Sequence, residues 1–574
     1  MHLIDSVGKE KKIKYLCPHH EQAAAMAAEG YSRVSGKMGV VVVTSGPGGT
    51  NTLTGVIQQW LDSIPCLYIS GQIKEETSIV SCPDLGLRQL GDQEINIVDI
   101  VRPVTKYAVI VRDPLSIRYH LEKAIYLATH GRPGPVWLDI PLNVQPVMID
   151  ENRLEGFKPD TEIERKKLQL SKQISETIAL LRKAERPVFL AGHGIRLSGA
   201  QDVFRGFIEK TRIPVLTTFC GFDLLPSDHH LYAGRVGTLG NRSGNFALQN
   251  ADVLLSVGSR NNIRQVSYNW KVFARAAKKI VVDIDEAELK KPTIKPDVAI
   301  QADARVFLTE LLKQSKTIKF PVWNKWLNWC MIRKNKYPVV LKEYWKSNNP
   351  VNPYCFIETL TNVLKRDTIL VSANGTACVT LFQAGVVKEG QRMFWNSGCA
   401  SMGYDLPAAI GACVANNNKP VVCLAGDGSL QMNIQELETV IAYNLPVKIF
   451  VLNNNGYISM RQTQDAFFSG RYVACGPESG VKFPDILKVA KAYGFKTKSI
   501  SAHNEMKRKI KEVLKTTGPV LCEVKISQDY KFIPKVSSQL KPDGKLVSKP
   551  LEDMFPFLPR EEFYSNMIIK PLPE

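Results

Sequence analysis

The sequence contains no pair of cysteines at a C-x-x-C spacing, although 12 of its 574 residues are cysteine. This absence excludes the commonest dithiol redox motif and the paired-cysteine type of zinc site. Several cysteines, among them Cys66, Cys413 and Cys423, lie inside apolar runs. We therefore expect reduced thiols in the core of a cytoplasmic protein.

Long apolar runs and blocks of like charge are also missing. The first residues, "MHLIDSVGKEKKIKYL", contain no apolar signal region, and no window of 18 apolar residues occurs, so we expect neither secretion nor a membrane span. The net charge is +19, from 74 basic and 55 acidic residues, but no run reaches five like charges. This pattern favours a diffuse cationic surface that suits anionic ligands, and we expect no nucleic-acid partner.

What the sequence does contain is an alternation of strand-like apolar runs with helical patterns, in a chain that is 44% apolar. We expect an α/β fold of three doubly wound parallel-sheet domains, at residues 1–148, 165–315 and 350–537. A charged linker, "DENRLEGFKPDTEIERKK", separates the first two blocks. Residues 538–574 form a tail rich in Pro, Lys and Glu, for which the pattern predicts no regular structure.

Two polar clusters follow neighbouring strands in the third block. Strand "PVVCLA" leads into Asp427, and after a helical segment strand "VKIFVL" leads into Asn454. A strand–helix–strand unit of this length joins parallel strands, so both side chains emerge at one carboxyl edge. Oxygen ligands suit Mg²⁺, and the helix opened by Gly428 and Ser429 suits a phosphate. The alternative is that the first cluster is only a tight turn and that the asparagines only cap a strand.

The pair of clusters resembles the thiamine-diphosphate signature, in which G-D-G is followed by N-N roughly thirty residues later. By this resemblance the first cluster, Gly426 to Gly428, contacts the diphosphate, and the Mg²⁺ ligands are Asp427, Asn454 and the backbone carbonyl of Gly456. "HHEQAAAMAAEGYSR" and "TSGPGGTN" resemble the acetohydroxyacid (acetolactate) synthase large subunit. There the acid matching Glu21 bonds the cofactor's pyrimidine N1′ across a dimer interface, and we expect a homodimer or tetramer.

An Ala-rich helix is expected to open at Glu21 after a short strand, while His19 and His20 are interpreted as packing residues. The resemblance extends over nearly the whole chain. It implies that Met402, in "SGCASMGYDLPAAIGA", bends the cofactor, and that Gly375 and Thr376, in "ANGT", hold the diphosphate, although the family's Gln-His there is Thr-Ala. It also implies an FAD-binding middle block, with these positions carried over: Gly192, Gly194, Thr217, Gly237 and Asp283.

The acceptor side departs from the family. Gln93 and Arg264 match the family's Gln and Arg, which make them candidates for catalysis and substrate binding. Asp92, however, stands where the family has Phe, after an apparent insertion. Leu142 replaces a Lys, and Thr463 replaces a Trp. The resemblance thus implies an intact cofactor site beside a roomier acceptor pocket.

We therefore expect thiamine-diphosphate-dependent decarboxylation of a 2-keto acid, pyruvate, and transfer of the two-carbon unit to a carbonyl acceptor, as in acetolactate synthase of branched-chain amino acid biosynthesis. Two alternatives stay open, namely transfer to a keto-sugar nucleotide and a cofactor-binding protein without activity. Because only 20 residues precede Glu21, we also expect Met1 to be an internal methionine of a longer reading frame, or the protein to be truncated, and the first sheet to have an unpaired edge.

Overall fold

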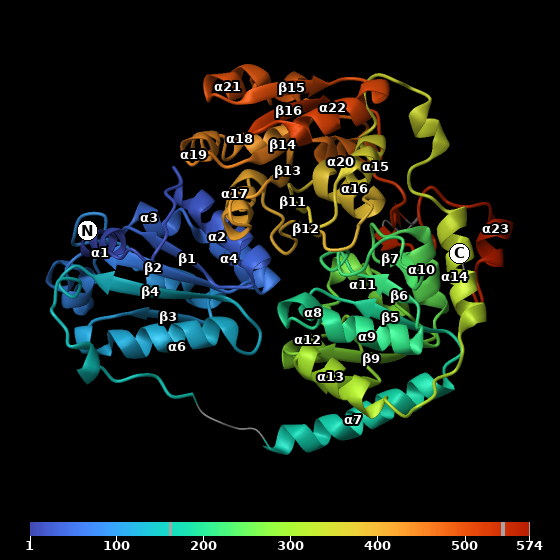
Figure 1. Cartoon of the computed structure of the whole chain (residues 1–574), viewed down its shortest axis with the longest axis horizontal. Coiled ribbons are helices and arrows are strands. Elements are labelled where there is room, and N and C mark those ends of the chain that lie inside the picture. Colours follow the sequence, from blue (N-terminus) through green and yellow to red (C-terminus); the bar gives the residue numbers. More distant parts are fainter. Residues whose placement is uncertain (160–163, 541–545, 573–574) are drawn as a thin grey trace.

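The computed structural model describes residues 1–159, 164–540 and 546–572. It contains three separate parallel sheets, each wrapped by helices, which form three lobes (Figure 1). The predicted fold class is confirmed. Part of the predicted charged linker, residues 160–163, lies outside the described residues. Within the described ranges, no helix combines the length and apolar character needed to cross a bilayer.

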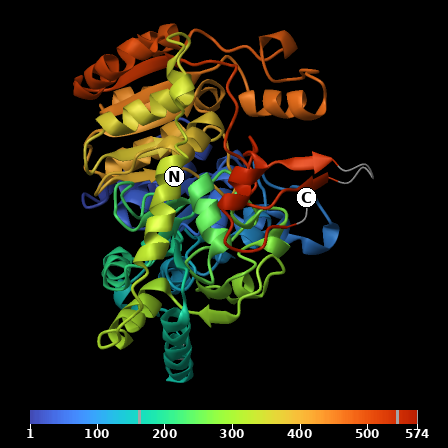
Figure 2. The same cartoon turned by 90° about the vertical axis from the view of Figure 1, so that its right-hand side faces the viewer.

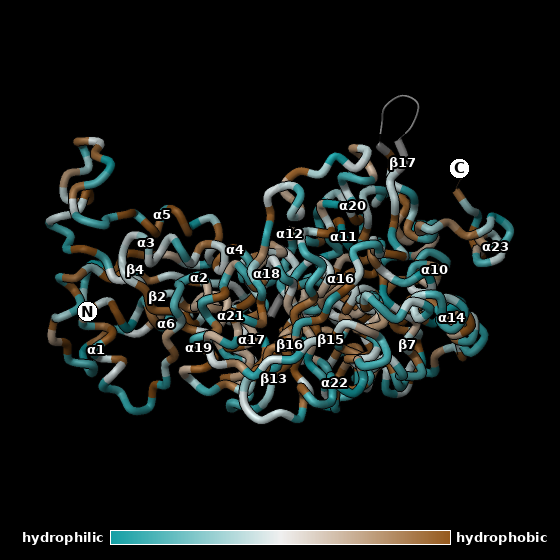
Figure 3. Tube along the Cα trace, turned by 90° about the horizontal axis from the view of Figure 1, so that it is seen from above, coloured by the Kyte–Doolittle hydropathy of each residue, from teal (hydrophilic) through white to brown (hydrophobic). Residues whose placement is uncertain are grey.

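The N-terminal lobe has a four-stranded parallel sheet in the order β1-β2-β4-β3. Its strands are β1 (Gly39–Val43), β2 (Cys66–Gln72), β3 (Tyr107–Ile110) and β4 (Pro135–Pro141). Its helices are α1 (His2–Lys9), α2 (Glu21–Ser35), α3 (Pro47–Thr50), α4 (Leu53–Asp62), α5 (Ile97–Val101) and α6 (Ile117–Thr129). The segment before α5, residues 73–96, contains short 3₁₀ turns and projects from the lobe (Figure 3).

The short strand expected before Glu21 is not formed, so that prediction was wrong. The backbone N–H of Cys17 donates to the Tyr443 hydroxyl (2.9 Å), and those of His19 and His20 donate to the Glu436 carboxylate. Side chains of the C-terminal lobe thus replace a neighbouring strand as partners of these groups. Among the described residues, β1 pairs on one side only, with β2.

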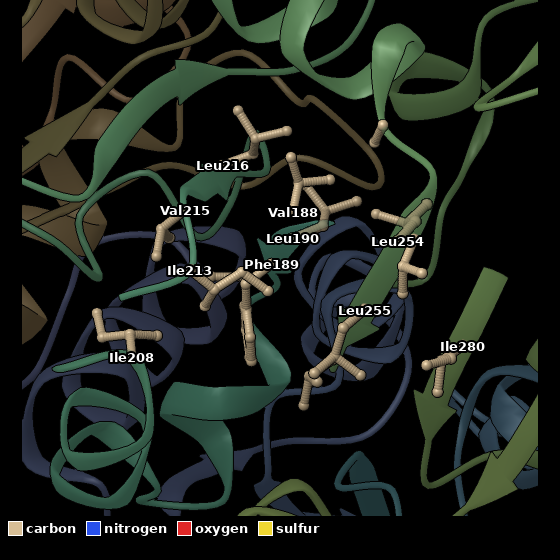
Figure 4. Packing of buried hydrophobic residues seen from close by; sticks show 14 of the residues in the cluster. Val188, Phe189, Leu190, Ile208, Ile213, Val215, Leu216, Leu254, Leu255 and Ile280 are labelled. Carbon is tan, nitrogen blue, oxygen red and sulfur yellow. The ribbon is translucent and has the colours of Figure 1, made fainter. Parts of the chain in front are cut away.

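The central lobe has a six-stranded parallel sheet in the order β10-β9-β8-β5-β6-β7. Its strands are β5 (Pro187–Ala191), β6 (Val215–Thr217), β7 (Tyr232–Arg235), β8 (Val253–Val257), β9 (Lys278–Asp283) and β10 (Val298–Gln301). Its helices are α7 (Glu164–Lys183), α8 (Gly194–Leu197), α9 (Gln201–Thr211), α10 (Arg242–Asn250), α11 (Ile263–Val266), α12 (Glu286–Lys290), α13 (Ala304–Gln314) and α14 (Asn324–Lys336). Strands buried on both faces need apolar side chains throughout, and Val188, Phe189 and Leu190 of β5 fill this core (Figure 4).

The C-terminal lobe has a six-stranded parallel sheet in the order β12-β11-β13-β14-β16-β15. Its strands are β11 (Ile369–Ser372), β12 (Arg392–Phe394), β13 (Val421–Gly426), β14 (Val447–Asn453), β15 (Lys496–Ile500) and β16 (Val520–Lys525). Its helices are α15 (Pro353–Val363), α16 (Thr376–Ala384), α17 (Asp405–Ala415), α18 (Asp427–Gln431), α19 (Glu436–Ala442), α20 (Ile458–Phe467), α21 (Ile486–Ala492) and α22 (His503–Lys515).

The segment that was expected to lack regular structure contains the hairpin β17 (Ser538–Leu540) and β18 (Leu546–Ser548) and the helix α23 (Arg560–Ser565). It packs on the central lobe, where the buried Glu552 carboxylate pairs with Arg275 at 2.6 Å. Leu551 and Met554 are buried beside it. Apolar anchors and this ion pair hold a segment whose average composition is polar.

Helices α2 and α17 join the N-terminal and C-terminal lobes. Their backbones touch, because a Cβ atom at Gly30 would meet the carbonyl of Ala408 and one at Gly411 would meet the carbonyl of Ala27. A buried ion pair, Arg33 with Glu29 at 2.7 Å, lies along the same contact. Close packing of this kind fixes the N-terminal and C-terminal lobes relative to each other.

Candidate functional site

The carboxyl edge of the C-terminal sheet brings together the two polar clusters that the sequence singled out. Asp427 directly follows β13, and Asn454 follows β14. One Asp427 carboxylate oxygen accepts the N–H of Gly428 (2.8 Å), and the other accepts those of Asn454 (3.1 Å) and Gly456 (3.2 Å). The three residues expected to bind Mg²⁺ are therefore neighbours around one carboxylate.

The electrostatics of this edge suit a cation. Burial raises the pKa of Asp427 to about 6, against the opposing effect of the backbone N–H donors. The side-chain oxygen of Asn454 is buried and has no hydrogen-bond partner among the described residues. A desolvated carboxylate and an unpartnered amide oxygen are costly alone but are good ligands for a hard cation. The residues fit Mg²⁺.

The strand order reverses between β11 and β13, which is where ligands bind in open α/β sheets. Gly375, with φ of +66°, precedes α16 at the end of β11, and the Thr376 hydroxyl is hydrogen-bonded to the Tyr530 hydroxyl. On the other side of the crevice, the Ser429 hydroxyl accepts the N–H of Gly403 at 2.9 Å. The predicted diphosphate-binding residues thus line this switch point from both sides.

Glu21 and Gln93 border one turn of the N-terminal lobe, residues 44–51. Glu21 opens α2, and its carboxylate accepts the side-chain N–H of Asn51 at 3.0 Å. Gly46 in the same turn has φ of +59°, and a Cβ atom there would lie 2.6 Å from the Gln93 carbonyl. The Gln93 side chain itself is exposed. The structure therefore places the two predicted catalytic residues on either side of this turn.

Met402 lies in a half-buried turn between the N-terminal and C-terminal lobes. Next to it, the Ser401 hydroxyl donates to Gln58 of α4 (2.6 Å), and Asn374 at the end of β11 donates to the Ser401 carbonyl (2.8 Å). Asn433 donates to the Gly403 carbonyl (2.8 Å). These contacts hold the turn of Met402 between α4 of the N-terminal lobe and the segment of the C-terminal lobe that follows α18.

Three polar residues that organise these turns, namely Gln58, Asn433 and Glu436, were not predicted from the sequence. Each is buried. The signal for two of them was present, because "QMNIQELET" begins two residues after the Gly-Asp-Gly motif and so places an amide and an acid close to it in the sequence. Gln58 has no such signal, since only its contact with a segment more than 300 residues away in the sequence gives it a role.

The central lobe has a cavity of about 310 Å³ at the carboxyl edge of its sheet, where β5 and β8 mark the reversal of strand order. Gly194 and Asp283 lie on its wall. Burial raises the pKa of Asp283 to about 6. Gly192 lies just behind, where a Cβ atom would meet the carbonyl of Gly258. This cradle of close backbone turns, with an acid at the end of a neighbouring strand, is typical of dinucleotide sites.

Unsatisfied polar atoms surround the same cavity. Both ring nitrogens of His193 and the side-chain nitrogen of Gln265 are buried without a partner among the described residues. The Thr217 hydroxyl, behind the wall, is also unpartnered. Gly237, with φ of +125°, packs under the Arg264 carbonyl rather than on the wall. A nucleotide such as FAD fits these groups, because its oxygens and nitrogens would satisfy them.

Arg264 connects the central lobe to the diphosphate edge. Its guanidinium lies over the ring of Phe219, 4.8 Å from the centroid, and Phe219 lines the cavity. Burial raises the pKa of the Cys378 thiol, on α16, to about 12, and the charge of Arg264 opposes this shift. Arg264 is therefore close to the helix that begins at Thr376, as a substrate-binding role requires.

The three altered acceptor-side residues lie on separate elements. Asp92 is exposed in the segment before α5. Leu142 is half-buried after β4, and its N–H donates to the Gln72 carbonyl. Thr463 is exposed on α20, where its hydroxyl bonds the Ser459 carbonyl. No contact joins these residues in the described part of one chain.

Family models match all three lobes. They are described as the N-terminal TPP binding domain (residues 1–98), the central domain (174–311) and the C-terminal TPP binding domain (373–524) of thiamine pyrophosphate enzymes. The acetolactate synthase large subunit of Lactococcus lactis subsp. lactis is 34% identical over 544 residues, covering 94% of this chain and 90% of the relative. The chain belongs to the acetolactate synthase large-subunit family of thiamine pyrophosphate enzymes.

Other members of this family agree over a similar extent. The acetolactate synthase large subunit of Porphyra purpurea is 33% identical and covers 92% of this chain and 87% of its own. The probable acetolactate synthase large subunit of Methanocaldococcus jannaschii is 33% identical, with 90% and 86% covered. The prediction of a thiamine-diphosphate-dependent transferase that decarboxylates pyruvate and ligates the product to a carbonyl is confirmed at this level.

Proposed function

We propose that this enzyme anchors thiamine diphosphate through Mg²⁺ held by Asp427, Asn454 and the Gly456 carbonyl. The observation that carries the proposal is the Asp427 carboxylate, held by three backbone N–H groups, beside the side-chain oxygen of Asn454, which is unpartnered among the described residues. A cation at this point would compensate both groups and would attract the diphosphate to the start of α16. Gly375 and Thr376 would then contact the phosphate oxygens.

Glu21 is proposed to exchange a proton with the pyrimidine nitrogen N1′ of the cofactor. Gln93 is proposed to form a hydrogen bond with the reacting carbonyl of the substrate. Thiamine diphosphate, when bound, supplies a carbon nucleophile that attacks a 2-keto acid and stabilises the charge left after CO₂ departs. The residues of this chain supply orientation and proton transfer. Glu21 can do so because it is half-buried and bonded by a single neutral amide, which leaves one carboxylate oxygen available.

FAD is proposed to occupy the central cavity. Support comes from the glycine cradle at Gly192 and Gly194, from Asp283, and from the unpartnered nitrogens of His193. The direct experiment is to add FAD to purified protein and to measure flavin fluorescence during titration. Quenching that Asp283→Ala abolishes supports this site, while unchanged fluorescence in the wild type refutes it.

A homodimer is proposed as the working unit, because two elements that carry Gln93 and Thr463 expose apolar side chains. Leu85 is 68% exposed in the segment before α5, and Phe467 is 58% exposed at the end of α20. The segment before α5, drawn in blue, and α20, drawn in orange, project from the same side of the molecule (Figure 2). Exposed apolar patches of this kind commonly mark interfaces. Sedimentation analysis that finds only monomer at micromolar concentration contradicts the proposal.

Two classes of acceptor substrate are compatible with the residues of this chain. Arg264 favours a carboxylate acceptor such as a second pyruvate, which would give acetolactate. Asp92, Leu142 and Thr463 favour a larger carbonyl compound with no carboxylate next to its carbonyl, such as a keto-sugar nucleotide. The deciding experiment supplies pyruvate alone and with each candidate acceptor, and identifies products by mass spectrometry. Acetolactate alone supports the first acceptor, and a two-carbon adduct of the sugar nucleotide supports the second.

A further inference from the structure

The buried carboxylate of Glu436 crosses from the C-terminal lobe to the residues that precede α2. The N–H of His19 donates to both of its oxygens (3.1 and 3.2 Å), and the N–H of His20 donates to one (3.1 Å). The Thr439 hydroxyl donates to the other at 2.6 Å. Hydrogen bonds to a buried carboxylate are stronger than bonds between neutral groups, so this contact anchors the chain firmly.

These anchored amides belong to the two residues directly before Glu21. One residue after it, the Gln22 side-chain oxygen accepts the amide of Asn433 at 3.1 Å, and Asn433 also bonds the Gly403 carbonyl. A short segment of the C-terminal lobe therefore holds the chain on both sides of Glu21. The same segment follows the helix that Asp427 opens, so it connects the proposed metal ligand with the proposed proton-transfer acid.

We propose that Glu436 is a positioning residue that fixes the place and direction of Glu21. This inference rests on the proposed function of Glu21. The Glu21 carboxylate has one hydrogen bond among the described contacts, from Asn51, so its direction follows the start of the helix on which it stands. A shift of the helix start by about 1 Å can cost a catalytic group on the order of 100-fold in rate.

A role in joining the lobes is the competing explanation, but the lobes have another and larger contact. Helices α2 and α17 pack backbone to backbone at Gly30 and Gly411, and the buried Arg33–Glu29 pair lies along them. Loss of the Glu436 bonds would leave that contact in place. The effect of losing the Glu436 bonds should therefore be confined to residues 17–22, which include Glu21.

The test compares Glu436→Gln with Glu438→Gln, a matched control in the first turn of the same helix. Glutamine turns an N–H group toward the donors at His19 and His20. Without cofactor, amide hydrogen exchange at these two residues should rise at least tenfold in Glu436→Gln and stay unchanged in the control. With thiamine diphosphate and Mg²⁺, exchange of the cofactor's C2 proton should slow about 10- to 100-fold, while its Kd changes less than threefold.

Two further variants separate positioning from general damage. Glu436→Asp keeps the charge and should recover at least part of the C2 exchange rate. Adding Glu436→Gln to Glu21→Gln should slow exchange no further than Glu21→Gln alone, because the group being positioned is gone.

A wild-type C2 exchange rate in Glu436→Gln overturns the inference, as does a Kd that rises in proportion to the lost rate. Failure of the wild type to bind thiamine diphosphate would instead reject the proposed function itself. That result is recognised in the wild-type measurement, before any variant is compared.

Discussion

The N-terminal and C-terminal sheets share one topology but divide the work differently. Strands β1-β2-β4-β3 and β13-β14-β16-β15 follow the same order along the chain, and all are parallel. The C-terminal sheet continues past β13 with β11 and β12, which creates a reversal of strand order. The N-terminal sheet ends at β1 among the described residues. Of these two sheets, as far as the structure describes them, the C-terminal one alone therefore has the reversal of strand order at which α/β sheets bind ligands.

Hydrogen bonding separates the two regions more clearly than burial does. The half-buried Asp427 carboxylate accepts three backbone N–H groups, and Asn454 is buried. Glu21 is half-buried too but accepts one side-chain hydrogen bond, and Gln93 is exposed. The groups at the C-terminal edge are thus fixed before a ligand binds, whereas those of the N-terminal turn stay accessible. We infer that the C-terminal edge binds the cofactor and that the N-terminal turn acts on it.

The largest expected effect is on the binding side. Asp427→Ala removes the carboxylate around which Asn454 and Gly456 are arranged, and should abolish Mg²⁺-dependent binding of thiamine diphosphate. Isothermal titration with and without Mg²⁺ measures this. Unchanged folding, judged by circular dichroism, is the control. Retention of tight Mg²⁺-dependent binding would mean that the metal ligands lie elsewhere. The inference that the C-terminal sheet binds the cofactor and the N-terminal lobe acts on it would then be wrong.

Glu21→Gln tests the other side of the comparison. Because this residue is expected to transfer a proton rather than to hold the ligand, the Kd for thiamine diphosphate should change little. Turnover should fall by several orders of magnitude, since a proton-transfer group alone contributes about 10²–10⁴-fold. Steady-state kinetics of pyruvate consumption provide the measurement. Near-full turnover would remove Glu21 from its proposed role.

Much of this division could be predicted from the sequence, and there are physical reasons why the rest could not. Asp427 and Asn454 could be placed at one edge because a strand–helix–strand unit always returns parallel strands to the same side. The missing strand before Glu21 could not be foreseen, since Tyr443 and Glu436 satisfy its N–H groups from more than 400 residues away. Likewise, Gln58 acquires its role only through tertiary contact.

A pH experiment sharpens the comparison within the N-terminal sheet. Asp139 of β4 is buried, and burial raises its pKa to about 6, although Ser70 and Gln72 donate to it. An acid with a raised folded-state pKa binds its proton more tightly when folded. Its contribution therefore becomes less favourable as pH rises from about 4 to 6, and is constant above that.

Asp139→Asn should accordingly gain stability relative to the wild type on going from pH 4.5 to pH 7, by about 2 kcal/mol from the pKa difference. Thermal unfolding of both proteins at the two pH values gives the comparison, and cancels titrations that they share. A stability difference that does not change with pH would show that folding does not raise the pKa of Asp139.

The smallest expected effect concerns the acceptor and tests the predicted influence of Thr463 in the C-terminal lobe. Thr463 is exposed on α20 and makes only a local bond to the Ser459 carbonyl, so a tryptophan can replace it without disturbing the core. An aromatic wall contributes about 1 kcal/mol of contact with a small keto acid, which corresponds to roughly a fivefold change in preference. Thr463→Trp should therefore raise the ratio of acetolactate to larger adducts about fivefold when pyruvate and a bulky carbonyl compete. Thr439→Trp would not be a useful control, because Thr439 is buried. Gln464→Trp is the control, because it places the same ring one position further along α20, where it points in a different direction. An equal shift in both variants would mean that added bulk, and not the position of Thr463, sets acceptor choice.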